Sequence, residues 1–238
     1  MVLYSYMQTF KKIDLLLAAI IGEIAAWLLI ILGKVIISPD AYEKFSGLIK
    51  LLPIIFPVIC VAFFYVAFLV SKKIAIVYQI AKFVLVGGLN TLVDWGILAF
   101  LIFFFRKFLI IDSETVLLTI FSVAILYYSL YKSISFIIAT LNSYVWNKLW
   151  TFKRQATESV GKEFTQFIIV SVIGFLINVG IASGIFKFIV PVGGLNSDQW
   201  AIAAAVAATA ISMIWNFLGY KFIVFDVKMK NDEQIGAV

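Results

Sequence analysis

The chain has no histidine and a single cysteine, Cys60, among its 238 residues. An intramolecular disulfide needs two cysteines, and the common zinc sites and Ser-His-Asp triads need histidine or several cysteines, so all three are excluded. Charged residues make up 13% of the chain, against about 25% in a typical soluble protein. We therefore expect no catalytic residues of these classes, no metal centre and no cofactor.

Hydrophobic residues are abundant instead, at 63% of the chain, and the mean hydropathy is +1.08. About 20 apolar residues, rising 1.5 Å each in a helix, cross a hydrocarbon core of about 30 Å. Six runs of this kind occur, at residues 15–33, 51–70, 83–105, 134–152, 167–192 and 200–225. They are continuously apolar and do not alternate, which predicts an all-α polytopic membrane protein with about six spans and excludes a large soluble catalytic domain.

The distribution of lysine and arginine predicts the orientation of these spans, because both residues favour cytoplasmic loops. With the N-terminus inside, twelve fall in cytoplasmic segments, Lys82 among them, and seven on the other side, including Lys132. We therefore expect both termini in the cytoplasm. A seventh span at the apolar stretch 116–131 would reverse this balance. This stretch is expected to form an outer-leaflet interfacial or re-entrant helix, or an N-terminal extension of the fourth span.

The second half of the chain contains an internal duplication. Two pairs of runs align, residues 82–94 with 166–178 at an offset of 84, and residues 143–152 with 216–225 at an offset of 73. In the first alignment Asp94 corresponds to Asn178, and in the second Lys148 corresponds to Lys221. Each copy contains two spans, an even number, so both copies enter the membrane from the same side as a parallel repeat.

The duplication also suggests how the chain is divided. We expect an N-terminal transmembrane hairpin at residues 1–71, an interfacial linker helix at 72–82, a four-span domain at 83–228 and a polar tail at 229–238. The four-span domain consists of repeat 1, residues 83–154, and repeat 2, residues 164–228. The linker helix is predicted because basic and apolar residues alternate there at helical spacing.

Three runs carry a resemblance to the GtrA-like family, namely residues 83–95 (FVLVGGLNTLVDW), 142–152 (NSYVWNKLWTF) and 216–225 (NFLGYKFIVF). The resemblance covers about residues 78–228. It implies a small multi-pass protein of the bacterial cytoplasmic membrane that moves polyprenyl-phosphate-linked sugars for polysaccharide or teichoic-acid glycosylation. It also implies a partner membrane glycosyltransferase. The N-terminal hairpin and the long segment 112–131 depart from the family pattern and leave room for a specialised partner or lipid.

Polar side chains within the predicted spans are candidates for a substrate path. Asp94 lies 11 residues into its span, about 16 Å deep at 1.5 Å per residue. A carboxylate there costs at least about 2.5 kcal/mol, so we expect either a polar cavity for substrate passage or proton sensing, or a structural bond to the other repeat, with Asn178 as the facing amide. The proposed path consists of Asn90, Thr91, Asp94, Asn142, Asn178 and Asn216.

A second set of candidates lies at the cytoplasmic ends of the spans. Lys148 and Lys221 are interpreted either as topology anchors whose long stems reach the headgroups, or as ligands of a phosphate. The candidate lipid-phosphate site consists of Asn147, Lys148, Arg154 and Lys221. The neighbouring aromatic residues, typical of an interfacial belt but also suited to a sugar face, are Trp146, Trp150 and Tyr220.

Three classes of function remain after these exclusions. The favoured class is a translocator of an undecaprenyl-phosphate-linked sugar, and the alternative is a non-transporting membrane anchor for a glycosyltransferase. A small multidrug-type exporter is the third, because Glu23 lies in the middle of the first span, although outside the duplicated unit. The loops are too short for a nucleotide-sugar-binding domain, so we expect a protein that is not an enzyme. No nucleic-acid partner is expected, and a homo-oligomer is left open.

Overall fold

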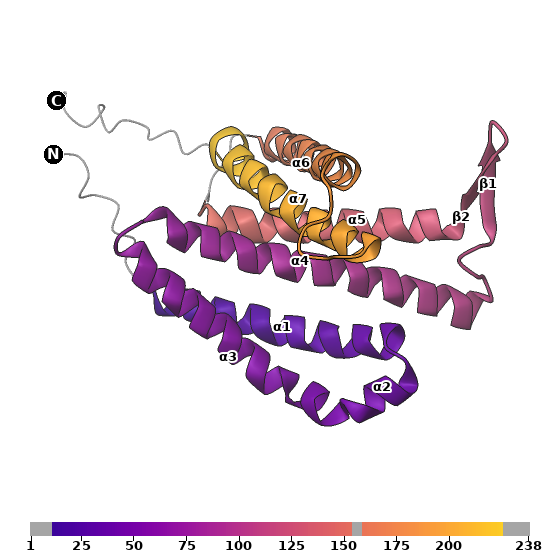
Figure 1. Ribbon diagram of the computed structural model, residues 1–238, viewed down its shortest axis with the longest axis horizontal. Coiled ribbons are helices and arrows are strands. Elements are labelled where there is room, and N and C mark those ends of the chain that lie inside the picture. The colour runs from indigo at the N-terminus through magenta and orange to yellow at the C-terminus, as the bar shows by residue number, and fades with distance from the viewer. Residues whose placement is uncertain (1–10, 154–158, 226–238) are drawn as a thin grey trace. The chain divides into compact units, whose positions relative to one another are not determined.

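The structure is a computed structural model that describes residues 11–153 and 159–225 (Figure 1). The α-helices within these ranges are α1 Lys12–Ile36, α2 Pro39–Lys44, α3 Ser46–Ser71, α4 Ile76–Phe104, α5 Tyr127–Trp146, α6 Val160–Phe188 and α7 Ser197–Gly219. Three π-helical segments continue them, η1 Phe105–Leu109 after α4, η2 Asn147–Thr151 after α5 and η3 Tyr220–Val224 after α7. Strands β1 Val116–Ile120 and β2 Val123–Leu126 lie between α4 and α5.

Five helical segments in the described chain are long and apolar enough to cross a membrane, namely Lys12–Val35, Ser46–Ser71, Ile76–Leu109, Val160–Phe188 and Trp200–Val224. The all-α, multi-pass membrane fold predicted from the sequence is thereby confirmed. The fourth predicted span, residues 134–152, corresponds to α5 and η2, and α5 packs beside α4 (Figure 1). It falls outside the group of five because polar side chains such as Lys132 and Asn142 dilute its apolar sequence.

The chain divides into two compact units, Met1–Thr151 and Phe152–Val238. In the first unit α1 packs on α3, both pack on α4, and α4 packs on α5. In the second unit α6 packs on α7 and η3. The N-terminal hairpin therefore belongs to the same unit as the first repeat, and the boundary predicted at residue 71 is only a turn between helices.

A buried ion pair joins this N-terminal hairpin to α4. Lys82 Nζ lies 2.9 Å from Asp14 Oδ1, and each of the two residues is 1% exposed. Tyr78 Oη donates to Asp14 Oδ2 at 2.7 Å, and Trp150 Nε1 donates to Asp14 Oδ1 at 2.8 Å. Lys82 is therefore an interior residue of α4 and not the loop cation that the charge count assumed. Without Lys82, more lysines and arginines still lie on the side predicted to be cytoplasmic than on the other side, so the predicted orientation does not change.

No separate linker helix occupies residues 72–82. Residues 72–75 form the turn after α3, and α4 begins at Ile76 and continues without a break to Phe104. The physical reason is that Tyr78 and Lys82, one turn apart, both face Asp14 and are fully buried. This segment is the first part of a packed helix, so its basic and apolar residues do not indicate an interfacial one.

The helix predicted for residues 116–131 is wrong for its first part, which forms an antiparallel hairpin between α4 and α5 (Figure 1). Phe121 and Ser122 at its turn have φ values of 46° and 66°, as a two-residue type I′ turn requires. Valine, isoleucine and threonine favour this extended conformation. The alternative expectation, an extension of the fourth span, holds for the remainder, because α5 begins at Tyr127.

The two copies of the duplicated sequence adopt the same local structure at their ends. The segments η2 and η3 begin at Asn147 and Tyr220, which correspond at the predicted offset of 73. Lys148 Nζ lies 5.4 Å from the centre of the Tyr144 ring, and Lys221 Nζ lies 5.8 Å from the centre of the Phe217 ring. Tyr144 and Phe217 also correspond at this offset, so the two copies share this lysine–aromatic contact as well as their sequence pattern.

Candidate functional site

The first group of polar side chains lies between α4 and α5, and we call it the α4–α5 seam. Lys132 forms an ion pair with Asp94 Oδ2, and Ser135 Oγ donates to Asp94 Oδ1 at 2.7 Å. One turn before Asp94 on the same face of α4, Asn90 Oδ1 accepts a hydrogen bond of 3.4 Å from Asn142 Nδ2. The predicted path residues Asn90, Asp94 and Asn142 therefore come together along one helix pair.

Sequence reasoning missed two members of this seam, Lys132 and Ser135. The charge distribution predicts Lys132 in an outer loop, but α5 begins before it and brings its ammonium to Asp94. Asp94 lies ten residues before the end of α4 at Phe104, about 15 Å from it at 1.5 Å per residue. A carboxylate at this depth needs a partner, and the side chains of Lys132 and Asp94 remain 40% and 18% exposed. The site is therefore charge-balanced and accessible.

Thr91 does not join the seam. Its hydroxyl donates to the Gly87 carbonyl within α4 at 3.1 Å, and the side chain is exposed. An added Cβ at Gly87 or Gly88 would meet no atom within 4 Å in the described residues, so both glycines face open space. Thr91 therefore lies on the exposed side of α4 beside Gly87 and has no bond to α5 among the described residues.

The second repeat carries an uncharged counterpart, the α6–α7 seam. Asn178 Nδ2 donates to Thr209 Oγ1 and to Ser212 Oγ, both at 3.2 Å. Asn216 packs directly against the α6 backbone at Gly174, where an added Cβ would overlap it. The counterparts Asp94 and Asn178 thus each have partners within their own unit, and neither depends on the predicted bond between them to satisfy its side chain.

The lysines at the ends of the repeats are half-buried. Lys148 Nζ donates to Tyr144 Oη at 3.2 Å, and Lys221 lies against Phe217 and Phe222. Asn147, in contrast, is 1% exposed, and its amide donates to the Ser143 carbonyl at 2.9 Å. The two lysines are therefore partly exposed in the structure, whereas Asn147 is buried. Arg154 lies outside the described residues.

The comparison with known families matches residues 82–225 to the family described as "GtrA/DPMS, transmembrane domain". The chain belongs to this family. The match begins at Lys82 and ends after η3, so it contains both seams and both repeat-end lysines. Membership of the GtrA/DPMS family makes this a multi-pass membrane protein with a function related to glycosyl lipids.

A relative in Bacillus subtilis (strain 168), described as the uncharacterized membrane protein YngA, is 32% identical over 154 residues. The alignment covers 64% of this chain and 82% of the relative. No solved structure matches. The GtrA/DPMS match excludes α1 and α3, so the hairpin attached through Asp14 is an addition to the family domain.

The aromatic residues predicted for a membrane interface or a sugar face lie mostly in the interior of their own compact units. Trp150 is 4% exposed and Tyr220 is 5% exposed. The ring of Tyr220 stacks on Phe167 with centroids 4.3 Å apart, and its hydroxyl lies 2.6 Å from Ser171 Oγ. Trp146 is partly buried against the hydrophobic core. These three residues therefore pack the repeat ends, and the sequence signal that predicted an interface reflected interior aromatic packing.

Proposed function

We propose that this protein moves an undecaprenyl-phosphate-linked sugar across the bacterial cytoplasmic membrane, for glycosylation of a surface polysaccharide or teichoic acid. The observation that supports the proposal most directly is the α4–α5 seam, in which Asp94, Lys132 and Ser135 form a charge-balanced group deep in a helix pair. The chain's membership of a family with a glycosyl-lipid-related function supports a lipid-linked sugar as the substrate.

The seam has the chemistry that a sugar headgroup needs when it leaves water. A sugar hydroxyl both donates and accepts, so it can replace hydrogen bonds to water by bonds to a carboxylate, an ammonium or an amide. From Lys132 to Asn142 the seam extends ten residues along α5, about 15 Å at 1.5 Å per residue. This is about half of a hydrocarbon core of ~30 Å. The polyprenyl tail would remain in the lipid beside the apolar outer faces of the helices.

Partial exposure distinguishes the Asp94–Lys132 pair of this seam from the buried salt bridge between Asp14 and Lys82. Lys132 and Asp94 are partly exposed, so their bonds can be exchanged for bonds to a substrate without leaving an isolated charge in the core. The ammonium has three donors, of which Asp94 uses one. A headgroup passing the seam would accept from Lys132 while its hydroxyls donate to Asp94.

The lysines at the repeat ends are proposed to bind the lipid phosphate on the cytoplasmic side. Lys148 lies 16 residues after Lys132, about 24 Å along a helix at 1.5 Å per residue. Asn142, at the other end of the α4–α5 seam, is six residues before Lys148, so a phosphate held at Lys148 would place the attached sugar near the Asn142 end of this seam. Arg154 is proposed as a further phosphate ligand, because a guanidinium can form a bidentate bond to phosphate oxygens.

The alternative is a non-transporting anchor for a membrane glycosyltransferase. One observation favours it, the N-terminal hairpin that lies outside the family match and is held by the buried pair of Asp14 and Lys82. Such an addition enlarges the intramembrane surface without extending either seam. In both versions the glycosyl transfer itself is assigned to a separate protein.

The test is reconstitution of the purified full-length protein into liposomes that carry an undecaprenyl-phosphate-linked monosaccharide. Transbilayer movement is followed as the fraction of sugar that an external, impermeant periodate reagent oxidises. We expect movement above protein-free liposomes, a loss of at least about ten-fold in Asp94→Asn and Lys148→Met, and no change in Glu43→Gln, whose side chain is exposed on α2. No movement with folded wild-type protein that copurifies with a glycosyltransferase would favour the anchor instead.

A further inference from the structure

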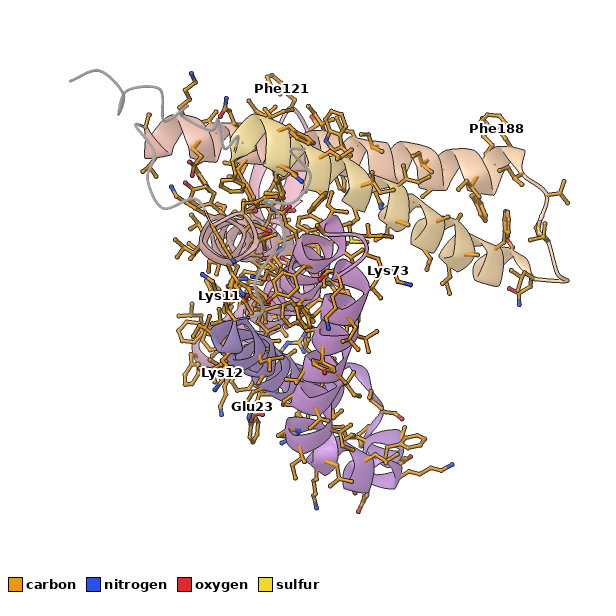
Figure 2. All side chains as sticks on the ribbon, turned by 90° about the vertical axis from the view of Figure 1, so that its left-hand side faces the viewer. Lys11, Lys12, Glu23, Lys73, Phe121 and Phe188 are labelled. Carbon is orange, nitrogen blue, oxygen red and sulfur yellow. The ribbon has the colours of Figure 1, made fainter. Side chains whose placement is uncertain are left out.

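A carboxylate on the outer surface of the N-terminal hairpin has no role in either seam. Glu23 is the twelfth of the 24 residues in the span Lys12–Val35, about 16 Å from its start at 1.5 Å per residue. It is partly exposed, and Figure 2 shows it on the outward side of α1. The depth is therefore close to the middle of the hydrocarbon core, where an ionisable side chain is costly and needs a partner.

The other carboxylates within the described spans of the first unit each have a lysine. Asp14 pairs with Lys82, and Asp94 pairs with Lys132. No ion pair of Glu23 occurs among the described residues, and its hydrogen bond comes from Trp27 Nε1 at 2.8 Å. An indole N–H is a neutral donor, so Glu23 has no cationic partner among the described residues.

The surface around Glu23 has the form of a helix-docking face. Exposed residues recur every three or four positions along α1 at Ile13, Leu16, Ile20, Ile24, Trp27, Ile31 and Val35. We call this set the α1 stripe, and Glu23 lies at its edge beside Trp27. Trp27 is 53% exposed, and tryptophan is among the residues that contribute most to protein interfaces. Aliphatic residues above and below would pack along an adjacent helix.

We propose that the α1 stripe is an intramembrane docking surface for a transmembrane helix of another protein, and that this helix carries a lysine or arginine at mid-depth. Charge complementarity selects this occupant. Lipid tails supply no cation in the core. In a two-fold contact with a second copy of the chain, the α1 stripes of both copies would meet. The two Glu23 carboxyl groups would then face each other, and neither would gain a cation. The proposal is independent of the translocation proposed above.

The test uses two synthetic transmembrane peptides of leucine and alanine that differ only at the central position, lysine in one and leucine in the other. Full-length protein carrying a photo-crosslinking amino acid in place of Ile20 is reconstituted with each peptide in liposomes. We expect about five-fold or more crosslinking to the lysine peptide over the leucine peptide. Glu23→Gln should abolish this preference, while Glu43→Gln, on the exposed helix α2, should keep it.

A charge-exchanged pair guards against a folding artefact. Glu23→Lys should lose the lysine peptide and gain a third peptide with a central aspartate, provided that both variants unfold at the wild-type temperature. Equal crosslinking of the lysine and leucine peptides would overturn the proposal. So would a preference that survives in Glu23→Gln, or crosslinks formed mainly between two copies of the protein.

The same photo-crosslinking variant, expressed in native membranes, supplies a second and independent readout. Sequencing of the crosslinked partner peptide should identify a transmembrane helix with lysine or arginine near its centre. A partner helix without a basic residue at that depth would refute the charge-based assignment, as would crosslinks to lipid alone.

Discussion

Lys82→Met is predicted to destabilise the first unit strongly, because it removes the cation from a buried carboxylate. Asp14 is 1% exposed and accepts from Lys82, Tyr78 and Trp150 at distances of 2.7 to 2.9 Å. Removing one partner of a buried pair typically costs about 3–5 kcal/mol, since the remaining charge is left uncompensated. Methionine keeps most of the lysine volume, so little of this loss would come from a cavity.

The second variant of this series restores neutrality. Asp14→Asn combined with Lys82→Met removes both charges and keeps an amide oxygen that Tyr78 or Trp150 can still use as an acceptor. We therefore expect the double variant to be more stable than Lys82→Met alone by about 2 kcal/mol or more, because only hydrogen-bond losses of about 1 kcal/mol each remain.

The assay is equilibrium unfolding in mixed detergent micelles, followed by circular dichroism, with proteolysis at the turn 72–75 as a local probe of hairpin detachment. Lys82→Met should show earlier cleavage at this turn as well as lower stability. The reasoning would be refuted if Lys82→Met lost less than about 1 kcal/mol. It would also be refuted if the double variant lost the sum of the two single losses.

Two glycine substitutions test the close helix contacts. Gly22→Ala would place a Cβ 2.6 Å from Pro57 Cα, so we expect about 1–3 kcal/mol of destabilisation at the α1–α3 crossing in the same unfolding assay. Gly174→Ala would overlap Asn216 and should destabilise the α6–α7 pair by a similar ~1–3 kcal/mol, measured by proteolysis of the second unit. Gly180→Ala, with no atom within 4 Å, is the matched control and should be neutral or stabilising by up to about 1 kcal/mol. A control that falls as far as either variant would contradict the contact-based explanation.

The helices and the internal repeat could be predicted from the sequence, because both depend on local patterns. Continuous apolar runs give the spans, and the constant offset of 73 correctly relates the surroundings of Lys148 and Lys221. The sequence also predicts the polar face of α4, since the spacing of Asn90 and Asp94 puts them one helical turn apart.

The side-chain contacts between distant parts of the chain could not be predicted from the sequence. Asp14 meets Tyr78 and Trp150 across 64 and 136 positions of the chain, and nothing in local spacing relates them. The sequence does not predict that Lys132 lies in a helix, because the start of α5 depends on where the hairpin β1–β2 ends. That hairpin was itself hidden, since an apolar run without alternation has no helix or strand period.

The central claim, passage of a sugar headgroup along the α4–α5 seam, is tested most directly by a charge exchange within the seam. Transbilayer movement of the undecaprenyl-phosphate-linked sugar is measured in liposomes for the wild type, Asp94→Asn, Lys132→Met and the exchanged variant Asp94→Lys with Lys132→Asp. We predict a loss of at least about ten-fold in each single variant and substantial recovery in the exchanged one, because the pair acts through its balanced charges. Wild-type rates in both single variants, with each protein folded, would contradict the claim.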